Sequence, residues 1–168
     1  MKKSIIVAVI VTAIAVPAIV YAASPLFINN TINEPLPGTG DKPIEDAAMT
    51  DKNDDAVMAE LAGSFVGVGD GIHNAEGVAK ILYLKGGSDI LRLEDLKATN
   101  GPDLHVYLST DKHASDFVDL GRLKANIGSQ NYDIPEGTDL SKYSTVLVWC
   151  KQFSVLFGSA NLTSGMPA

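Results

Sequence analysis

Short runs of apolar residues separated by turn-forming residues dominate the chain from residue 63 to residue 162. This spacing, with no long amphipathic helix between the runs, predicts an all-β, β-sandwich-like domain. We expect about eight short strands in it. The expected strands are residues 64–68, 77–84, 90–93, 104–108, 122–124, 130–134, 144–149 and 152–158, with turns at 69–71, 86–89 and 100–103 and a polar loop at 111–119.

The strand expected at 104–108 shows the clearest alternation. Leu104, Val106 and Leu108 point to one face of a strand, because successive side chains alternate. His105 and Tyr107 point to the other face. This pattern predicts that the first three residues pack into the core.

The run at 144–149 is almost continuously apolar, which is typical of a central strand covered on both faces. Cys150 follows Trp149 at the end of this run. By the two-residue period, Cys150 shares a face with Val146 and Val148.

The N-terminus has the pattern of an export signal. Lys2 and Lys3 precede an uncharged apolar run that extends to Ala23. We interpret residues 1–23 as a signal peptide or a membrane anchor, since the length of the run does not separate the two. Either interpretation predicts an extracytoplasmic protein that is anchored at the cell surface or secreted.

Two further segments precede the β domain, which we place at residues 56–163. Residues 24–55 are rich in proline and acidic residues and have no apolar period, which predicts a flexible, disordered linker. Asp54 and Asp55 can cap a short helix that runs through Leu61.

Composition excludes some classes of function. The chain has 46% hydrophobic and 20% charged residues, as a globular protein does, and a net charge of −7. Because no basic stripe is present, we expect no nucleic-acid partner. The chain has one cysteine, so an internal disulfide cannot form.

No motif indicates a stand-alone enzyme or a covalently bound cofactor. The glycine-rich stretch at 67–71 lacks the third glycine of a dinucleotide-binding loop, and no nucleophile elbow occurs. Covalent haem attachment needs a Cys-x-x-Cys-His motif, which is absent. No His or Cys pair has the spacing of a metal site, so we predict none. His73 and His105 are the candidates for contact with a non-covalent haem or metal, and the cofactor is unknown.

Two interpretations of Cys150 are open at this point. Free cysteines are among the most buried residues, which favours an inert thiol in the core. A reactive thiol needs an accessible and electropositive setting, and Lys151 is the only such neighbour along the chain.

Several segments resemble, in order, one known family. Their order along the chain is His73 with Gly77, then 91–93, 101–109, 120–124 and 128–135. The most specific part is Tyr-Ser-Thr-Val-Leu-Val-Trp-Cys at 143–150, followed by a Phe-x-Val-x-Phe-Gly-x-Ala strand. Together these segments resemble the DM-thirteen domain family, a single-cysteine β domain that is proposed for electron transfer and is often associated with DOMON domains.

The resemblance implies an extracytoplasmic electron-transfer module in which Cys150 is the redox residue. A redox partner such as a cytochrome or a DOMON-type domain is expected in trans, and a membrane is a further partner if the N-terminal segment is retained. The alternative is a non-catalytic cell-surface binding or adhesion module with a structural cysteine. Access to the Cys150 sulfur distinguishes the two hypotheses.

Overall fold

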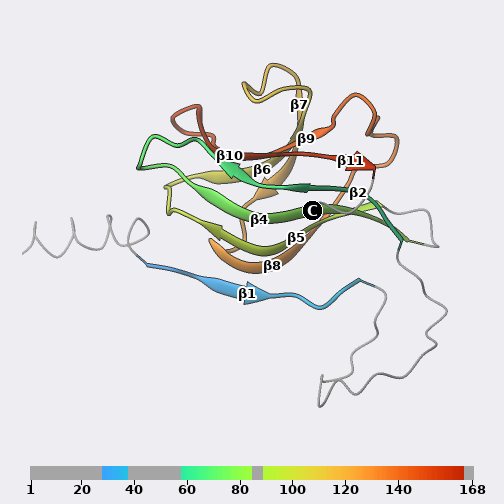
Figure 1. The fold of residues 1–168 in the computed structure, drawn as a ribbon, viewed down its shortest axis with the longest axis horizontal. Coiled ribbons are helices and arrows are strands. Elements are labelled where there is room, and N and C mark those ends of the chain that lie inside the picture. The colour runs from blue at the N-terminus through green and yellow to red at the C-terminus, as the bar shows by residue number, and fades with distance from the viewer. Residues whose placement is uncertain (1–27, 38–57, 85–88, 165–168) are drawn as a thin grey trace, which may run out of the picture.

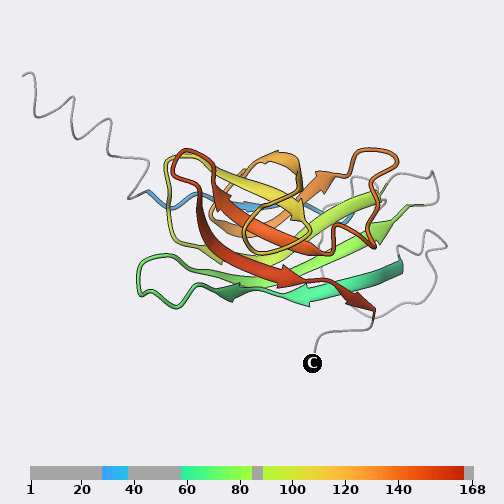
Figure 2. The same ribbon diagram turned by 90° about the horizontal axis from the view of Figure 1, so that it is seen from above.

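A computed structural model describes residues 28–37, 58–84 and 89–164. These residues form eleven strands in two sheets that pack face to face, and they contain no helix (Figure 1). Viewed from above, the two sheets lie as two layers (Figure 2). The predicted all-β, sandwich-like fold is therefore confirmed.

The first sheet has six strands, which are antiparallel except for the β1–β8 pair. In spatial order they are β1 (Thr31–Asn33), β8 (Ile127–Asp133), β5 (Asp89–Ala98), β4 (Ala75–Tyr83), β2 (Met58–Ser64) and β11 (Thr163–Ser164).

The second sheet has five antiparallel strands. In spatial order they are β3 (Val66–Gly67), β10 (Val155–Asn161), β9 (Thr145–Cys150), β6 (Leu104–Ser109) and β7 (Phe117–Arg122).

Strand β9 lies in the middle of the second sheet, between β6 and β10. Val106 of β6 pairs with Val148 of β9, and the two residues are completely buried. Leu104, Leu108 and Val146 belong to the same core cluster. The predicted inward face of 104–108 and the predicted central position of 144–149 are both confirmed, because apolar side chains from two adjacent strands meet the opposite sheet.

The outer face of β6 is also covered, which the alternation did not predict. Tyr107 is only 1% exposed, and its ring stacks on Phe117 of β7 with the centroids 4.2 Å apart. Trp149 lies on the other side of Tyr107 at 6.4 Å. A layer of aromatic rings thus shields this face from water.

Several strand boundaries differ from the prediction. The strand predicted at 122–124 ends at Arg122, and the one predicted at 64–68 is divided between β2 and β3. Strand β5 extends to Ala98 instead of residue 93, and β8 begins at Ile127 instead of residue 130.

Strand β7 begins at Phe117, inside the segment predicted as a polar loop. It is an edge strand, and Asp119, Gly121 and Arg122 interrupt its apolar residues, so its sequence gives little sign of the pairing with β6. Strand β10 begins at Val155, and residues 151–154 form a turn in which Ser154 has a φ of 54°.

The helix predicted from Asp54 to Leu61 can be compared with the structure from residue 58 onward, and there the chain is a strand. Residues 54–57 lie outside the described residues. Met58–Ser64 is strand β2, paired with β4 and, at its C-terminal end, with β11. Helix propensity is a weak preference, and pairing on both edges outweighs it here.

Part of the segment predicted as a flexible linker is instead ordered against the domain. Residues 28–37 run alongside β8, and Thr31–Asn33 pairs with it in parallel as β1 (Figure 1). Gly128 of β8, with a φ of 104°, permits this approach, because a Cβ there would overlap the carbonyl oxygen of Ile32. The rest of the predicted linker lies outside the described residues.

Residues 1–23, the predicted signal peptide or membrane anchor, also lie outside the described residues. Within the ranges that the structure describes, no helix has the length and apolar character needed to cross a membrane.

Glu34 fixes the end of β1 to the domain. Its carboxylate lies 2.8 Å from Lys124 Nζ and accepts a hydrogen bond of 2.7 Å from the Asn131 backbone N–H. Burial alone raises the pKa of Glu34, but these hydrogen bonds and the charges of Lys124 and Arg92 outweigh it, so the net pKa is lowered from 4.5.

We therefore predict a pH-dependent effect of Glu34→Gln on stability. A carboxylate with a lowered pKa stabilises the folded state above its unfolded pKa, and this contribution is lost as the pH falls through the folded value. Glu34→Gln should lower the denaturation midpoint at pH 7 and make no difference at pH 2. Glu136→Gln, at an exposed position, is the control and should be neutral at both values. Equal loss at both pH values would contradict the ion-pair account.

We also predict that Val148→Asp prevents stable folding. Val148 is completely buried, and an unpaired carboxylate there should cost at least roughly 3–5 kcal/mol. Val66→Asp, at a position that is 64% exposed in the same sheet, should unfold at nearly the wild-type denaturant concentration. A Val148→Asp protein as stable as Val66→Asp would show that this face is not the core.

Candidate functional site

Cys150 is the last residue of β9 and lies on the core face of its sheet. It pairs with Leu104 of β6 and Val155 of β10, and it is 1% exposed. Its thiol is free and belongs to the same core cluster as Val148. The face predicted for Cys150 is confirmed. Since the strand ends here, the thiol lies at one end of the sandwich rather than in its centre.

A pocket of about 250 Å³ opens at this end of the sandwich. The connections β3–β4, β5–β6 and β9–β10 meet there, together with the first part of β10. The lining residues are Ile72, His73, Asn100, Gly101, Pro102, Cys150, Phe153, Val155 and Phe157. Cys150 is therefore buried beneath connecting segments and yet lines an open cavity.

His73 is the second sequence-predicted site residue in this pocket. Its Nδ1 lies 2.6 Å from Oδ2 of Asp70, and its ring packs edge-on against Phe157 with centroids 4.6 Å apart. Asp70 also accepts hydrogen bonds from the backbone N–H groups of Ile72 and His73, so the loop closes on the aspartate side chain. These contacts fix the imidazole and leave Nε2 without a hydrogen bond among the described residues.

The loop strongly favours the charged form of Asp70. Its pKa is lowered from 3.8 to about 2, first by the backbone hydrogen bond from His73 and then by the His73 side chain and the Ile72 backbone N–H. Asp70 thus remains a carboxylate across the physiological pH range and can orient the His73 ring throughout it.

The remaining lining of the pocket is mostly apolar. Phe157, Val155 and Pro102 contribute apolar surface, and no Asp, Glu, Lys or Arg side chain is among the lining residues. Ile72 and Phe153 also line the pocket, and their exposed fractions are 71% and 63%, respectively. Cys150 and His73 are the groups in this lining that can take part in proton or electron transfer.

His105, the other candidate cofactor contact, does not line this pocket. It lies on the opposite face of the second sheet, where Nδ1 is 2.9 Å from Asp119 and Nε2 is 3.3 Å from Asp103. Arg122 and Lys151 contact the same two carboxylates at 2.6 and 3.1 Å. Oδ1 of Asp103 is buried and makes ion-pair contacts without a well-aligned hydrogen bond. His105 thus belongs to a network of charges, away from the thiol.

Burial raises the pKa of Asp119, but its hydrogen bonds from His105, Gly121 and Lys151 outweigh that effect and lower the pKa overall. Asp119 therefore retains its negative charge, which suits a structural role on the outer face of the sheet.

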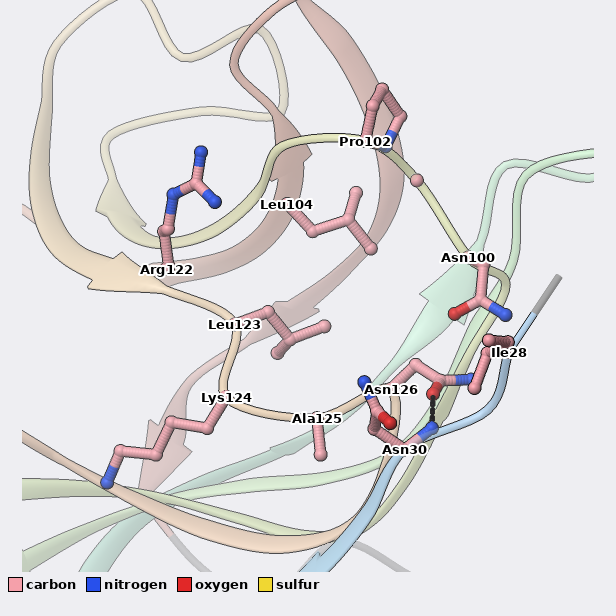
Figure 3. A pocket seen from close by; sticks show the side chains of 11 residues that line it. Ile28, Asn30, Asn100, Pro102, Leu104, Arg122, Leu123, Lys124, Ala125 and Asn126 are labelled. Carbon is pink, nitrogen blue, oxygen red and sulfur yellow. Dashed lines mark hydrogen bonds between the residues drawn. The ribbon is translucent and has the colours of Figure 1, made fainter. Parts of the chain in front are cut away.

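A second, more polar pocket of about 350 Å³ shares the segment 100–102 with the first (Figure 3). It contains Arg122 and Lys124, but the Lys124 side chain extends away from the other lining side chains. Arg122 is paired with Asp103 and Lys124 with Glu34. Because its cations already have partners, this pocket offers less for chemistry than the one at Cys150.

Across the described ranges, no group of three or more His, Cys, Asp or Glu side chains is placed to hold a metal ion. Asp70 and the aromatic lining of the pocket were not predicted as parts of a site. A signal for Asp70 was present, since an aspartate between two glycines, three residues before His73, is typical of a loop closed by its own side chain. The aromatic lining had no such local signal.

We predict that the ionisation of Asp70 reports its contact with His73. In an NMR titration the Asp70 carboxyl should titrate with a midpoint of about 2. His73→Phe retains the ring contact with Phe157 and the backbone hydrogen bonds but removes the imidazole nitrogens, so the midpoint should rise part of the way toward 3.8. His113→Phe, in the loop before β7, should leave the midpoint unchanged. An unshifted midpoint in His73→Phe would refute the contact.

No curated protein matches the chain. Among solved structures, a point mutant of Candida albicans superoxide dismutase 5 is similar, with 12% identity over 67% of this chain and 96% of that chain and a TM-score of 0.46. This likeness is too low to support a statement about function. Residues 67–162 match the family described as electron transfer DM13, over more than half of the 168 residues and including Cys150 and His73. The chain therefore belongs to the electron transfer DM13 family, the DM-thirteen family that the sequence resembles.

Proposed function

We propose that this protein is an extracytoplasmic electron-transfer module whose redox residue is Cys150. Membership of the DM13 family supports electron transfer in general. The identity of the redox residue, the location and the partner are our proposal.

The observation that carries the proposal is the placement of the thiol. Cys150 is 1% exposed, but it lines a pocket of about 250 Å³ at the end of the sandwich. A purely structural cysteine needs no such opening. A redox thiol needs access for a small oxidant and protection from larger ones, and a pocket provides both.

His73 supplies the proton acceptor. A thiol reacts as its thiolate, and an adjacent base activates it. His73 lines the same pocket, Asp70 holds its Nδ1, and its Nε2 is available to accept the proton. The carboxylate and the imidazole thus come from the β3–β4 connection, and the thiol comes from the end of β9.

The proposed cycle transfers two electrons. The thiolate attacks a hydroperoxide, the O–O bond breaks, and a sulfenic acid and an alkoxide or hydroxide form. The sulfenic acid returns to the thiol by taking up two electrons and two protons and releasing water. We propose that a cytochrome or a DOMON-type domain in trans supplies these electrons.

The alternative, a non-catalytic binding or adhesion module, is not favoured, since the family is one of electron transfer. The location outside the cytoplasm, with residues 1–23 as a signal peptide or membrane anchor, is supported by the sequence pattern of that segment.

The proposal predicts selective labelling of the native thiol. Iodoacetamide, a small uncharged reagent, should modify Cys150 in the folded protein, and His73→Phe should slow the reaction at pH 7 by about tenfold or more. Treatment with a hydroperoxide should produce a sulfenic acid that dimedone captures, detected by mass spectrometry.

Two controls accompany this experiment. His113→Phe removes an exposed imidazole elsewhere and should leave the rate unchanged, and Cys150→Ser should abolish both modifications. Labelling that occurs only after denaturation would refute a redox role for Cys150.

A further inference from the structure

We propose that the pocket over Cys150 binds a neutral aromatic molecule with a single ring hydroxyl, that is, a ligand of the phenol class. The inference rests on the proposed function in that it names the ligand of the same site. It depends, however, on the walls of the pocket and not on the reactivity of the thiol.

The size of the pocket suits one ring or two fused rings. A cavity of about 150 Å³ lined by apolar side chains is known to bind benzene. The pocket at Cys150 has about 250 Å³, which leaves room for a second ring but not for a large cofactor. It is open on one side, so a small ligand can enter without a rearrangement of the strands.

The walls favour an uncharged, flat ligand. Phe153, Phe157 and Pro102 present planar or ring-shaped surfaces, and Val155 and Ile72 add aliphatic ones. A charged ligand would lose its hydration here, because no Asp, Glu, Lys or Arg side chain is among the lining residues to replace it. An aromatic ring would instead replace water at apolar surface, which is favourable.

One polar group is positioned to orient such a ring. His73 is fixed through Nδ1 by Asp70, and its Nε2 has no hydrogen bond among the described residues. The other polar side chain of the lining, Asn100, donates its Nδ2 to Asn29. A hydroxyl group matches a single imidazole nitrogen, because it can either donate or accept.

The rim gives an independent reason to expect an occupant. Ile72 and Phe153 are among the most exposed large apolar side chains of the described residues, and both line this pocket. Exposed apolar groups gathered around a cavity are typical of ligand-binding sites. Part of their surface would be covered when a ring enters.

The test is calorimetric titration of the full-length wild-type protein with 1-naphthol in a reducing buffer, where the thiol has no oxidant to react with. We expect saturable binding of one molecule per chain with a dissociation constant below about 1 mM. Binding of 1-naphthoate, which has the same rings and a negative charge, should be at least tenfold weaker. No step of this binding uses the reactivity of the thiol, so a wild-type protein whose Cys150 proves redox-inactive should still bind 1-naphthol.

Two variants test the assigned contacts in the same background. Phe153→Ser should weaken binding of 1-naphthol by about tenfold, whereas Phe117→Ser removes an exposed aromatic ring from the opposite face of the sheet and should not. His73→Phe should also weaken it, by about tenfold, through loss of Nε2. Absence of saturable binding, equal affinity for 1-naphthoate, or equal effects of the two Phe→Ser changes would overturn the proposal.

Discussion

The pairing of β9 between β6 and β10 determines where the thiol of this protein lies. In this register Val146, Val148 and Cys150 face the opposite sheet, and Leu104 lies beside Cys150. A shift by one residue would turn all of these side chains to the other face. The apolar core excludes that shift, because it would place Trp149 between the sheets and three core side chains outside. The stability of the core and the position of Cys150 thus depend on one constraint.

The end of β9 and the connections around it form a pocket over the buried Cys150. Cys150 is the last residue of β9, so the chain turns away and leaves space above the sulfur. The loop before β4 is closed by Asp70, which brings His73 to the same space. Because the aspartate makes three hydrogen bonds within four residues, this arrangement is local and does not depend on a partner strand.

The two faces of the second sheet carry different kinds of side chains. The inner face carries the thiol and an apolar pocket with no acidic or basic side chain among its lining residues. The outer face carries His105 with Asp103 and Asp119, and next to them the rings of Tyr107 and Phe117. Successive side chains along β6 point to opposite faces of the sheet, so Leu104 faces the core and His105 faces outward. His105 therefore lies among charged groups, whereas His73 lines the apolar pocket.

The sequence by itself determined the all-β class, most strands, the core face of 104–108 and the face of Cys150, because a two-residue period and turn residues are local signals. Its similarity to a family also indicated the general function. Local signals could not place β1, β2 or β7: residues 28–37 are held by Gly128 and Lys124, far along the chain, and 58–64 by pairing on its edges. Only the tertiary structure could bring Cys150, His73 and Phe153 to one pocket, because that pocket forms where three connections meet.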